Sequence, residues 1–207
     1  MKPDQKFFVF DCESEGLHGQ TFAIGGGIYD IHGKPVEGSE FRFHCRQGVV
    51  GGCGDPNQAT SDREWVKANV QIHPESNVLP GPGNVAAAFR ELWAAAKAGF
   101  PGILMFVECG WPVEARFLIQ CVGNKPAERN WEGPYPLHEI ATLMLAAGLD
   151  PMDSYTRQPE ELPAHEPLAD ARLSARLLAA SLRRLDQANR MGEKAGEGPV
   201  ILHLEEA

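Results

Sequence analysis

The feature of this chain that most limits its fold is an apolar run that ends in two carboxylates. Residues 6–10, Lys-Phe-Phe-Val-Phe, predict a buried β-strand, and Asp11 and Glu13 follow at its C-terminal end, with Gly16 soon after. Side chains at positions i and i+2 of an extended segment lie on the same side, so Asp11 and Glu13 are expected to converge. Converging carboxylates repel each other unless a cation lies between them, and hard divalent cations prefer oxygen ligands. The pair therefore indicates either a divalent-metal site or, equally well, an ordinary polar turn after a strand.

A second motif lies near the C-terminus, where His165 and Asp170 precede a long run of helical apolar periodicity. Pro167 suits the first turn of a helix, so the final helix is expected from about Leu168 to Arg190, with Asp170 in or near its first turn. His165 then lies on a mobile loop that leads into the helix, where it can reach the site that Asp170 faces. The simpler interpretation, a capped helix start with a surface histidine, is common for any single His-x4-Asp.

The order and spacing of the two motifs resemble the DEDDh 3′-5′ exonucleases, a family that includes polymerase proofreading subunits, RNase T, oligoribonuclease and RNase AS. These proteins carry Asp-x-Glu at the end of the first strand, His-x4-Asp at the start of the last core helix, and a further acidic residue between them. The resemblance covers roughly residues 6–185. It implies an α/β, ribonuclease H-like fold, with a mixed central sheet flanked by helices. That sheet would combine an antiparallel three-strand meander with parallel strands, and the first strand would lie centrally.

The middle acidic residue of the family has two candidates here. Residues 103–107 predict a strand, Pro112 suits a helix start, and Glu114 stands three residues before Phe117, where the family usually has Asp. This sequence departs from that pattern by having glutamate in place of aspartate. The extra methylene of glutamate moves the carboxylate unless the backbone retreats. Glu108, at the strand end, is the competing candidate, and Glu114 is preferred. Without the resemblance, Glu114 is equally a first-turn glutamate that complements the helix dipole.

The resemblance also implies roles for these residues. Asp11 would be shared by two Mg²⁺ or Mn²⁺ ions. Glu13 and Asp170 would complete the coordination of the first ion, and Glu114 would support the site directly or through water. His165 would take the proton from the attacking water, since an unperturbed imidazole titrates near pH ~6.5. The product would be a nucleoside 5′-monophosphate from the 3′ end of single-stranded RNA or DNA.

Substrate contacts are implied next to the first acidic pair, where the family places an apolar wedge against the terminal base and backbone groups against the 3′-hydroxyl. The candidate substrate-binding residues are Ser14, Gly16, Leu17, His18 and Trp111. Trp111 or Phe22 is the candidate for stacking on bases, and core packing is the alternative for each ring. Residues 62–67 resemble the RNase AS branch, which favours RNA slightly over DNA.

The remaining elements follow from the apolar pattern. A strand is expected over 21–29, whose run Gly25–Gly27 indicates a bulge or a close backbone approach, and a half-exposed strand is expected over 41–45. Helices are expected over 84–99, with Asn84 as the cap, and over 137–147. Cys12 is expected to point into the core, away from the carboxylates.

Composition sets the outer limits. The chain has 207 residues with 43% hydrophobic content, which fits one exonuclease domain over residues 1–190 and a C-terminal tail over 191–207. The net charge of -9 argues against passive, charge-driven binding of nucleic acid, although holding one strand end needs only a local basic patch. No membrane span or signal peptide is predicted. Five cysteines, with no Cys-x2-Cys spacing, favour the reducing cytoplasm over a disulfide or zinc framework.

Two other function classes stay open at this point. One is a metal-dependent phosphoesterase that acts on small nucleotides, and the other is a non-catalytic member of the fold that binds nucleic acid or a partner. Four acidic candidates together with His165 argue against the non-catalytic member, because a binding module has no need of them. A homodimer is expected, because dimers are frequent among the resembling enzymes.

Overall fold

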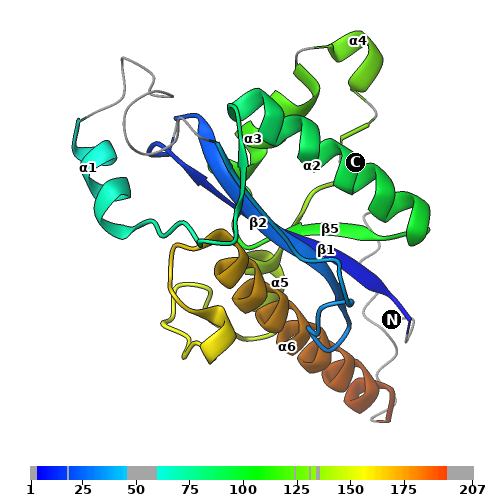
Figure 1. Cartoon of the computed structure of the whole chain (residues 1–207). Helices are drawn as coiled ribbons and strands as arrows, with labels where there is room; N and C mark the ends of the chain where they lie inside the picture. The colour runs from blue at the N-terminus through cyan, green and yellow to red at the C-terminus, as the bar shows by residue number, and fades with distance from the viewer. Residues whose placement is uncertain are drawn as a thin grey trace, which may run out of the picture.

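The computed structural model describes residues 4–17, 19–45, 60–123, 125–130, 132–133 and 136–194. Its strands are β1 (Lys6–Ser14), β2 (Thr21–Asp30), β3 (Phe41–Cys45), β4 (Asn77–Leu79), β5 (Leu104–Val107) and β6 (His138–Glu139). Its helices are α1 (Thr60–Asn69), α2 (Pro82–Gly99), α3 (Val113–Gly123), α4 (Pro126–Arg129), α5 (Ile140–Ala146) and α6 (Pro167–Lys194), with the short 3-10 helix η1 (Pro159–Glu161). Figure 1 shows their arrangement, in which the sheet lies between α2 and α3 on one side and α6 on the other.

The described strands form one mixed sheet in the order β4-β3-β2-β1-β5-β6. β1, β2 and β3 pair antiparallel, while β5 runs parallel to β1. The β3–β4 and β5–β6 pairs are also parallel. The predicted meander plus parallel strands is therefore confirmed, and β1 is the central strand beside β5.

The side chains of β1 alternate between two cores. Phe8, Phe10 and Cys12 belong to a cluster with Phe89 of α2 and Phe117 of α3. Cys12 is 6% exposed, so its predicted position in the core is confirmed. Because β1 is covered on both faces, its sequence is apolar at consecutive positions rather than at alternate ones.

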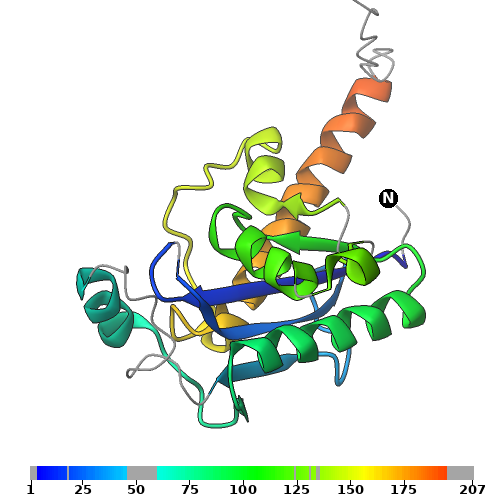
Figure 2. The same ribbon diagram turned by 90° about the horizontal axis from the view of Figure 1, so that it is seen from above.

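The opposite face of β1 packs against α5 and α6 (Figure 2). Phe7 and Val9 belong to a second cluster with Leu177 of α6. Because side chains alternate along a strand, Asp11 and Glu13 continue this face. The alternation therefore directs both carboxylates toward the side of the sheet on which α6 lies.

α6 meets β2 at the glycine run. A Cβ atom at Gly25 would lie 2.2 Å from the backbone nitrogen of Leu168, and one at Gly26 would lie 2.5 Å from the carbonyl oxygen of Val9. The run therefore marks a close backbone approach rather than a bulge. The register shift between β1 and β2 falls at Glu13 and Ser14 instead.

Several boundaries differ from the sequence predictions. β1 continues through Ser14, so the acidic pair lies within the strand, because pairing with β2 extends that far. α2 begins at Pro82 with Gly81 as its N-cap, so Asn84 is not the cap; Pro fits this position because its fixed φ matches the helix. α3 begins at Val113, after a cis Trp111–Pro112 peptide bond.

The predicted helix over 137–147 is shorter in the structure. His138–Glu139 forms β6 instead, and α5 begins at Ile140. So short a strand depends on pairing with β5, which the local apolar pattern does not reveal. α6 continues to Lys194, past the predicted domain boundary at 190, and the rest of the predicted tail lies outside the described residues. None of the described helices is long and apolar enough to cross a bilayer.

Candidate active site

The structure brings the predicted catalytic residues together at one end of β1. Glu13 of β1, His165 and Asp170 of α6 each offer a possible ligand atom, and these atoms lie within 4.8 Å of one another. Asp11 precedes Glu13 on the same face of β1. Burial and the negative charges of Asp170, Glu114 and Glu13 raise the pKa of the Asp11 carboxyl. Residues from three distant parts of the chain therefore meet in one cluster.

Asp170 and its neighbours also cap α6. The Oδ2 atom of Asp170 accepts a hydrogen bond from the backbone N–H of His165 at 3.0 Å, and Oε2 of Glu166 accepts one from the N–H of Ala169 at 2.8 Å. The bond to Ala169 satisfies a donor that a helix start leaves without an intrahelical partner, and the bond from His165 ties the preceding loop to the first turn. The cap therefore fixes the orientation of the Asp170 carboxylate.

Burial and mutual repulsion make these carboxylates hard to ionise together. Burial, followed by the charge of Asp170, raises the pKa of Asp11 well above its usual range. The same two causes raise the pKa of Glu13 to about 8, and burial raises the pKa of Glu114 to about 7. Such a cluster ionises fully near neutral pH only with a compensating cation. An oxygen-rich donor set of this kind suits Mg²⁺ or Mn²⁺.

Both candidates for the middle acidic residue lie near Asp11. Glu114 is buried in the first turn of α3, and its charge raises the pKa of Asp11 and of Glu13. Glu108 follows β5, and its Oε2 atom accepts a hydrogen bond from the hydroxyl of Ser174 on α6 at 3.0 Å. Glu108 also acts on Asp11, but less strongly than Glu114 does. Both glutamates therefore act on the Asp11 carboxyl, and Glu108 is in addition hydrogen-bonded to α6.

His165 lies on the loop before α6, as predicted, and its backbone is held from both sides. Its φ of 60° falls in the left-handed region, which few non-glycine residues adopt. Its backbone N–H donates a hydrogen bond to Oδ2 of Asp170, and its carbonyl accepts a hydrogen bond from the N–H of Gln71 at 2.8 Å. Its ring meets the ring of Trp65 edge to face, with centroids 5.0 Å apart. These contacts hold the imidazole at the edge of the carboxylate cluster.

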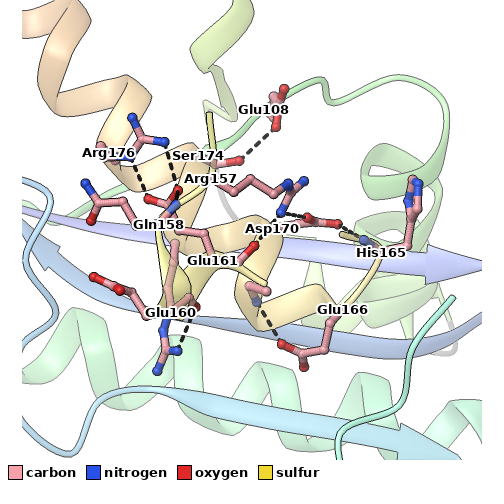
Figure 3. Close-up of polar contacts among 12 residues, drawn as sticks. Glu108, Arg157, Gln158, Glu160, Glu161, His165, Glu166, Asp170, Ser174 and Arg176 are labelled. Atoms are coloured by element: carbon pink, nitrogen blue, oxygen red, sulfur yellow. Dashed lines mark hydrogen bonds and ion pairs between the residues drawn. The ribbon is translucent and has the colours of Figure 1, made fainter. Parts of the chain in front are cut away.

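An ion pair fastens the segment 156–166, which carries His165, to α6 (Figure 3). Arg176 of α6 binds both carboxylate oxygens of Glu161, at 2.6 and 2.8 Å, and donates to the carbonyl of Thr156 at 2.8 Å. The side chain of Glu161 is only 3% exposed and that of Arg176 is 31% exposed, so the carboxylate is shielded from solvent while the guanidinium still reaches it. The segment is therefore anchored at its buried centre.

Two further arginines extend this anchoring. Arg172 of α6 donates to the carbonyl of Glu160 at 3.0 Å and binds both oxygens of Glu40, at 2.8 and 2.6 Å. Arg42 of β3 pairs with Glu166 at 3.1 Å. The loop that presents His165 is therefore connected both to α6 and to the sheet.

Arg157 brings a positive charge into the carboxylate cluster. Its Nη1 atom lies 2.6 Å from Oδ1 of Asp170 and donates to the carbonyl of Glu161 at 2.8 Å. Burial raises the pKa of Asp170, and Arg157 opposes that rise without cancelling it. Sequence reasoning missed Arg157, because a contact between residues this far apart in the chain leaves no local pattern.

A pocket of about 300 Å³ lies beside Glu13. The predicted substrate-binding residues Ser14, Gly16 and Leu17 line it, together with Trp65 of α1. Leu17 is 63% exposed and Trp65 is 50% exposed, so both offer apolar surface to a ligand. Trp65 was not among the predicted site residues, because the apolar stripe of α1 is too weak to show which of its side chains face a site.

The other predicted substrate contacts lie elsewhere. Trp111 is 72% exposed but lines a separate cavity of about 540 Å³ that also includes Leu137 and Leu182. Phe22 is completely buried in the core, so its predicted role in base stacking is wrong and its core-packing alternative holds. His18 lies outside the described residues.

No protein-family model and no curated protein matches this sequence. Solved structures do match it. Pop2p of S. pombe, in a form with Mg²⁺ and Mn²⁺ bound, aligns with a TM-score of 0.56 and 14% identity over 94% of this chain and 86% of that chain. Exonuclease I aligns with a TM-score of 0.55 and 15% identity over 94% of this chain and 45% of that chain. This chain has a ribonuclease H-like fold.

The predicted ribonuclease H-like fold, which the DEDD-type exonucleases share, is thus confirmed. The E. coli exonuclease I complex with single-stranded DNA, in a zinc-bound form, aligns with a TM-score of 0.52 and 14% identity, over 93% of this chain and 43% of that chain. This chain therefore spans less than half the length of exonuclease I. At identities this low the likeness concerns the fold alone.

Proposed function

We propose that this chain is a metal-dependent 3′-5′ exonuclease that releases nucleoside 5′-monophosphates from single-stranded nucleic acid, with RNA slightly preferred over DNA. The observation that carries the proposal is the meeting of Glu13, His165 and Asp170, with possible ligand atoms within 4.8 Å, beside Asp11 and Glu114. The fold shared with exonuclease I and with the Mg²⁺- and Mn²⁺-bound Pop2p supports the same reaction class. The preference for RNA rests on the resemblance of residues 62–67 to the RNase AS branch.

Four carboxylates would hold the metal ions: Asp11, Glu13, Glu114 and Asp170. Two Mg²⁺ or Mn²⁺ ions held by these residues would supply Lewis-acid polarisation of the phosphodiester and stabilisation of the attacking and leaving oxygens. The raised pKa values of Glu13 and Glu114 fit this role, because their protons leave when a cation compensates the negative charge. Binding of the ions would therefore release protons from these glutamates.

His165 is the proposed general base, which accepts the proton of the attacking water. An imidazole suits this step near neutral pH, because its ordinary pKa is ~6.5. The backbone bonds of His165 to Asp170 and Gln71 hold it at the cluster, while the edge contact with Trp65 orients its ring. The base is therefore positioned by the same loop and helix start that position a metal ligand.

The pocket lined by Leu17 and Trp65 is the proposed site for the terminal nucleotide. It lies directly beside Glu13, so a base held there places its phosphodiester near the carboxylates. Stacking on an aromatic ring contributes about 1–3 kcal/mol per base and tolerates any sequence. This grip does not depend on net charge, so it is compatible with a chain of charge -9.

The proposal is tested with 5′-labelled single-stranded RNA and DNA of matched sequence, in Mg²⁺, Mn²⁺ or chelator. The wild type is expected to give a metal-dependent ladder that shortens from the 3′ end, faster on RNA. Asp11→Asn should abolish the ladder. Asp30→Asn is the matched control, because Asp30 is the last residue of β2, where its Oδ1 atom accepts backbone hydrogen bonds from His32 and Lys34 that asparagine can also accept.

Each other outcome contradicts a stated part of the proposal. No degradation of either strand with any metal overturns the exonuclease. Cleavage of a mononucleotide ester without cleavage of the oligonucleotide points to the small-nucleotide phosphoesterase instead. Equal or faster cleavage of DNA removes the preference for RNA, and activity retained in Asp11→Asn removes the assigned site.

A further inference from the structure

We propose that Arg157 is a built-in counter-cation that competes with divalent ions for Asp170 and so sets the ion concentration at which the site fills. The inference rests on the proposed function for the identity of the ions. Its basis is the ion pair in which Nη1 of Arg157 lies 2.6 Å from Oδ1 of Asp170, one of the four proposed ligands (Figure 3).

The two carboxylate oxygens of Asp170 are held in different ways. The backbone N–H of His165 donates a hydrogen bond to Oδ2 at 3.0 Å, whereas Oδ1 is buried, accepts no hydrogen bond from the described residues, and has the charge of Arg157 beside it, with Nη1 at 2.6 Å. The side chain of Asp170 is only 13% exposed, which limits the directions from which a new ligand can approach. An ion that binds Asp170 must therefore share or replace one of these two partners.

Arg157 is the partner that gives way. The N–H of His165 is neutral and fixed in the cap of α6, so it cannot leave without disturbing the helix start. The guanidinium of Arg157 is a permanent cation on a long flexible side chain, and a divalent ion repels it. Binding of the ion and pairing of Arg157 with Asp170 therefore oppose each other.

Arg157 has other polar partners available when it leaves Asp170. Its Nη1 atom donates to the carbonyl of Glu161 at 2.8 Å, and its side chain is 22% exposed, so it can keep a hydrogen bond and gain water when it leaves Asp170. Glu161 stays in position during this change, because Arg176 binds both of its carboxylate oxygens. The segment that carries His165 is therefore not disturbed by the exchange.

The neighbouring arginines have different partners. Within the described part of the chain, Arg42 and Arg172 pair with Glu166 and Glu40, which are not proposed metal ligands. Arg157 instead pairs with a proposed ligand, in a cluster whose members raise one another's pKa. Its charge compensates part of the cluster in the absence of an ion, and it becomes an opposing charge once an ion arrives.

The test measures Mn²⁺ binding to the full chain by calorimetry, with free Mn²⁺ followed by electron paramagnetic resonance. Arg157→Gln is expected to lower the Mn²⁺ dissociation constant about tenfold, within the usual range for coupled binding events. Arg183→Gln is the matched control, because this exposed arginine lies on α6 about 20 Å along the helix from Asp170, at ~1.5 Å per residue. It should bind Mn²⁺ as the wild type does.

The outcomes separate this inference from the proposed function. Unchanged or weaker Mn²⁺ binding in Arg157→Gln, with saturable binding in the wild type and its loss in Asp11→Asn, overturns only the role of Arg157. Absence of saturable binding in the wild type, or equal binding in Asp11→Asn, overturns the metal site and the inference with it.

A second measurement uses the wild type and does not depend on the folding of a variant. In ¹⁵N spectra of arginine side chains, titration with diamagnetic Mg²⁺ is expected to shift the Nε–H resonance of Arg157. The resonance of Arg176 should stay in place, because its pair with Glu161 is not involved. An Arg157 resonance that is unchanged at saturating Mg²⁺ contradicts the exchange.

Discussion

Gly25 of β2 and Leu168 of α6 approach so closely that a Cβ atom at position 25 would lie 2.2 Å from the backbone nitrogen of Leu168. Gly25 is also the register partner of Asp11 on β1. The start of α6 therefore rests on the strand position next to Asp11, and Asp170 follows within one turn. The missing side chain at Gly25 is what lets the two carboxylates share a site.

Gly25→Ala is expected to push the start of α6 away from the sheet, because the obstructing atoms belong to the backbone and cannot move aside. Overpacking of this kind costs about 1–3 kcal/mol, so the free energy of unfolding should fall by that amount. Mn²⁺ binding should weaken as well, because Asp170 moves away from Asp11. Urea denaturation and calorimetry measure the two effects. Gly83→Ala is the control, because a Cβ atom at Gly83 meets nothing within 4 Å, and a normal result for both variants contradicts the close approach.

His165→Ala is expected to lower the rate of 3′-end trimming by about 10²–10⁴-fold, the usual contribution of a general base. Mn²⁺ binding should stay largely intact, because the four carboxylates that hold the ions are unchanged. The measurement pairs single-turnover cleavage of labelled RNA with Mn²⁺ calorimetry. His32→Ala, at an exposed turn, should behave as the wild type in both assays. A large loss of Mn²⁺ affinity in His165→Ala would show that the imidazole is an ion ligand rather than the base.

Local patterns explain which parts of the site could be predicted from the sequence. Asp11 and Glu13 share a face because β1 alternates, and Asp170 falls in the first turn because Pro167 opens α6; both facts depend only on neighbouring residues. Arg157 reaches Asp170 only through the folding of the segment before α6, so no residue spacing in the sequence predicts this contact.

The aromatic side chains show the same limit. Phe22 and Trp111 are the rings predicted from the sequence for base stacking, and only tertiary packing separates these two from Trp65. Phe22 is buried in the core, Trp111 lines a separate cavity, and Trp65 lines the pocket beside Glu13. The strands missed from the sequence, β4 and β6, are two or three residues long, so they depend on pairing rather than on an apolar pattern.

The stability of the protein in chelator is expected to depend on pH through Glu13. Its pKa is about 8 in the folded protein against 4.5 for an ordinary glutamate, so between these values the folded state binds more protons than the unfolded state. The free energy of unfolding therefore falls as pH rises through this window. Glu13→Gln removes the titration and should be more stable than the wild type near pH 8 by on the order of 2 kcal/mol, with little difference below pH 4.5.

Thermal denaturation of both proteins from pH 4 to 9 measures this difference. Glu37→Gln, at an exposed turn position, is the control and should follow the wild type. Saturating Mn²⁺ should reverse the order near pH 8, because the wild type gains ion-binding free energy that the variant loses in part. A stability difference that does not change with pH contradicts the raised pKa of Glu13.

The Arg176–Glu161 pair is expected to be strongly coupled, because Glu161 is 3% exposed and depends on Arg176 for its compensating charge. Arg176→Met leaves Glu161 with the hydrogen bond from the N–H of Gln158 but without its paired cation, so the free energy of unfolding should fall by about 1–3 kcal/mol. The double variant Arg176→Met, Glu161→Met removes both charges and should recover much of that loss. Urea denaturation of the two single variants and the double variant completes the cycle. Additive losses would mean that the pair does not fasten segment 156–166, whereas strong coupling, with slower RNA trimming in Arg176→Met, ties the position of His165 to this buried pair.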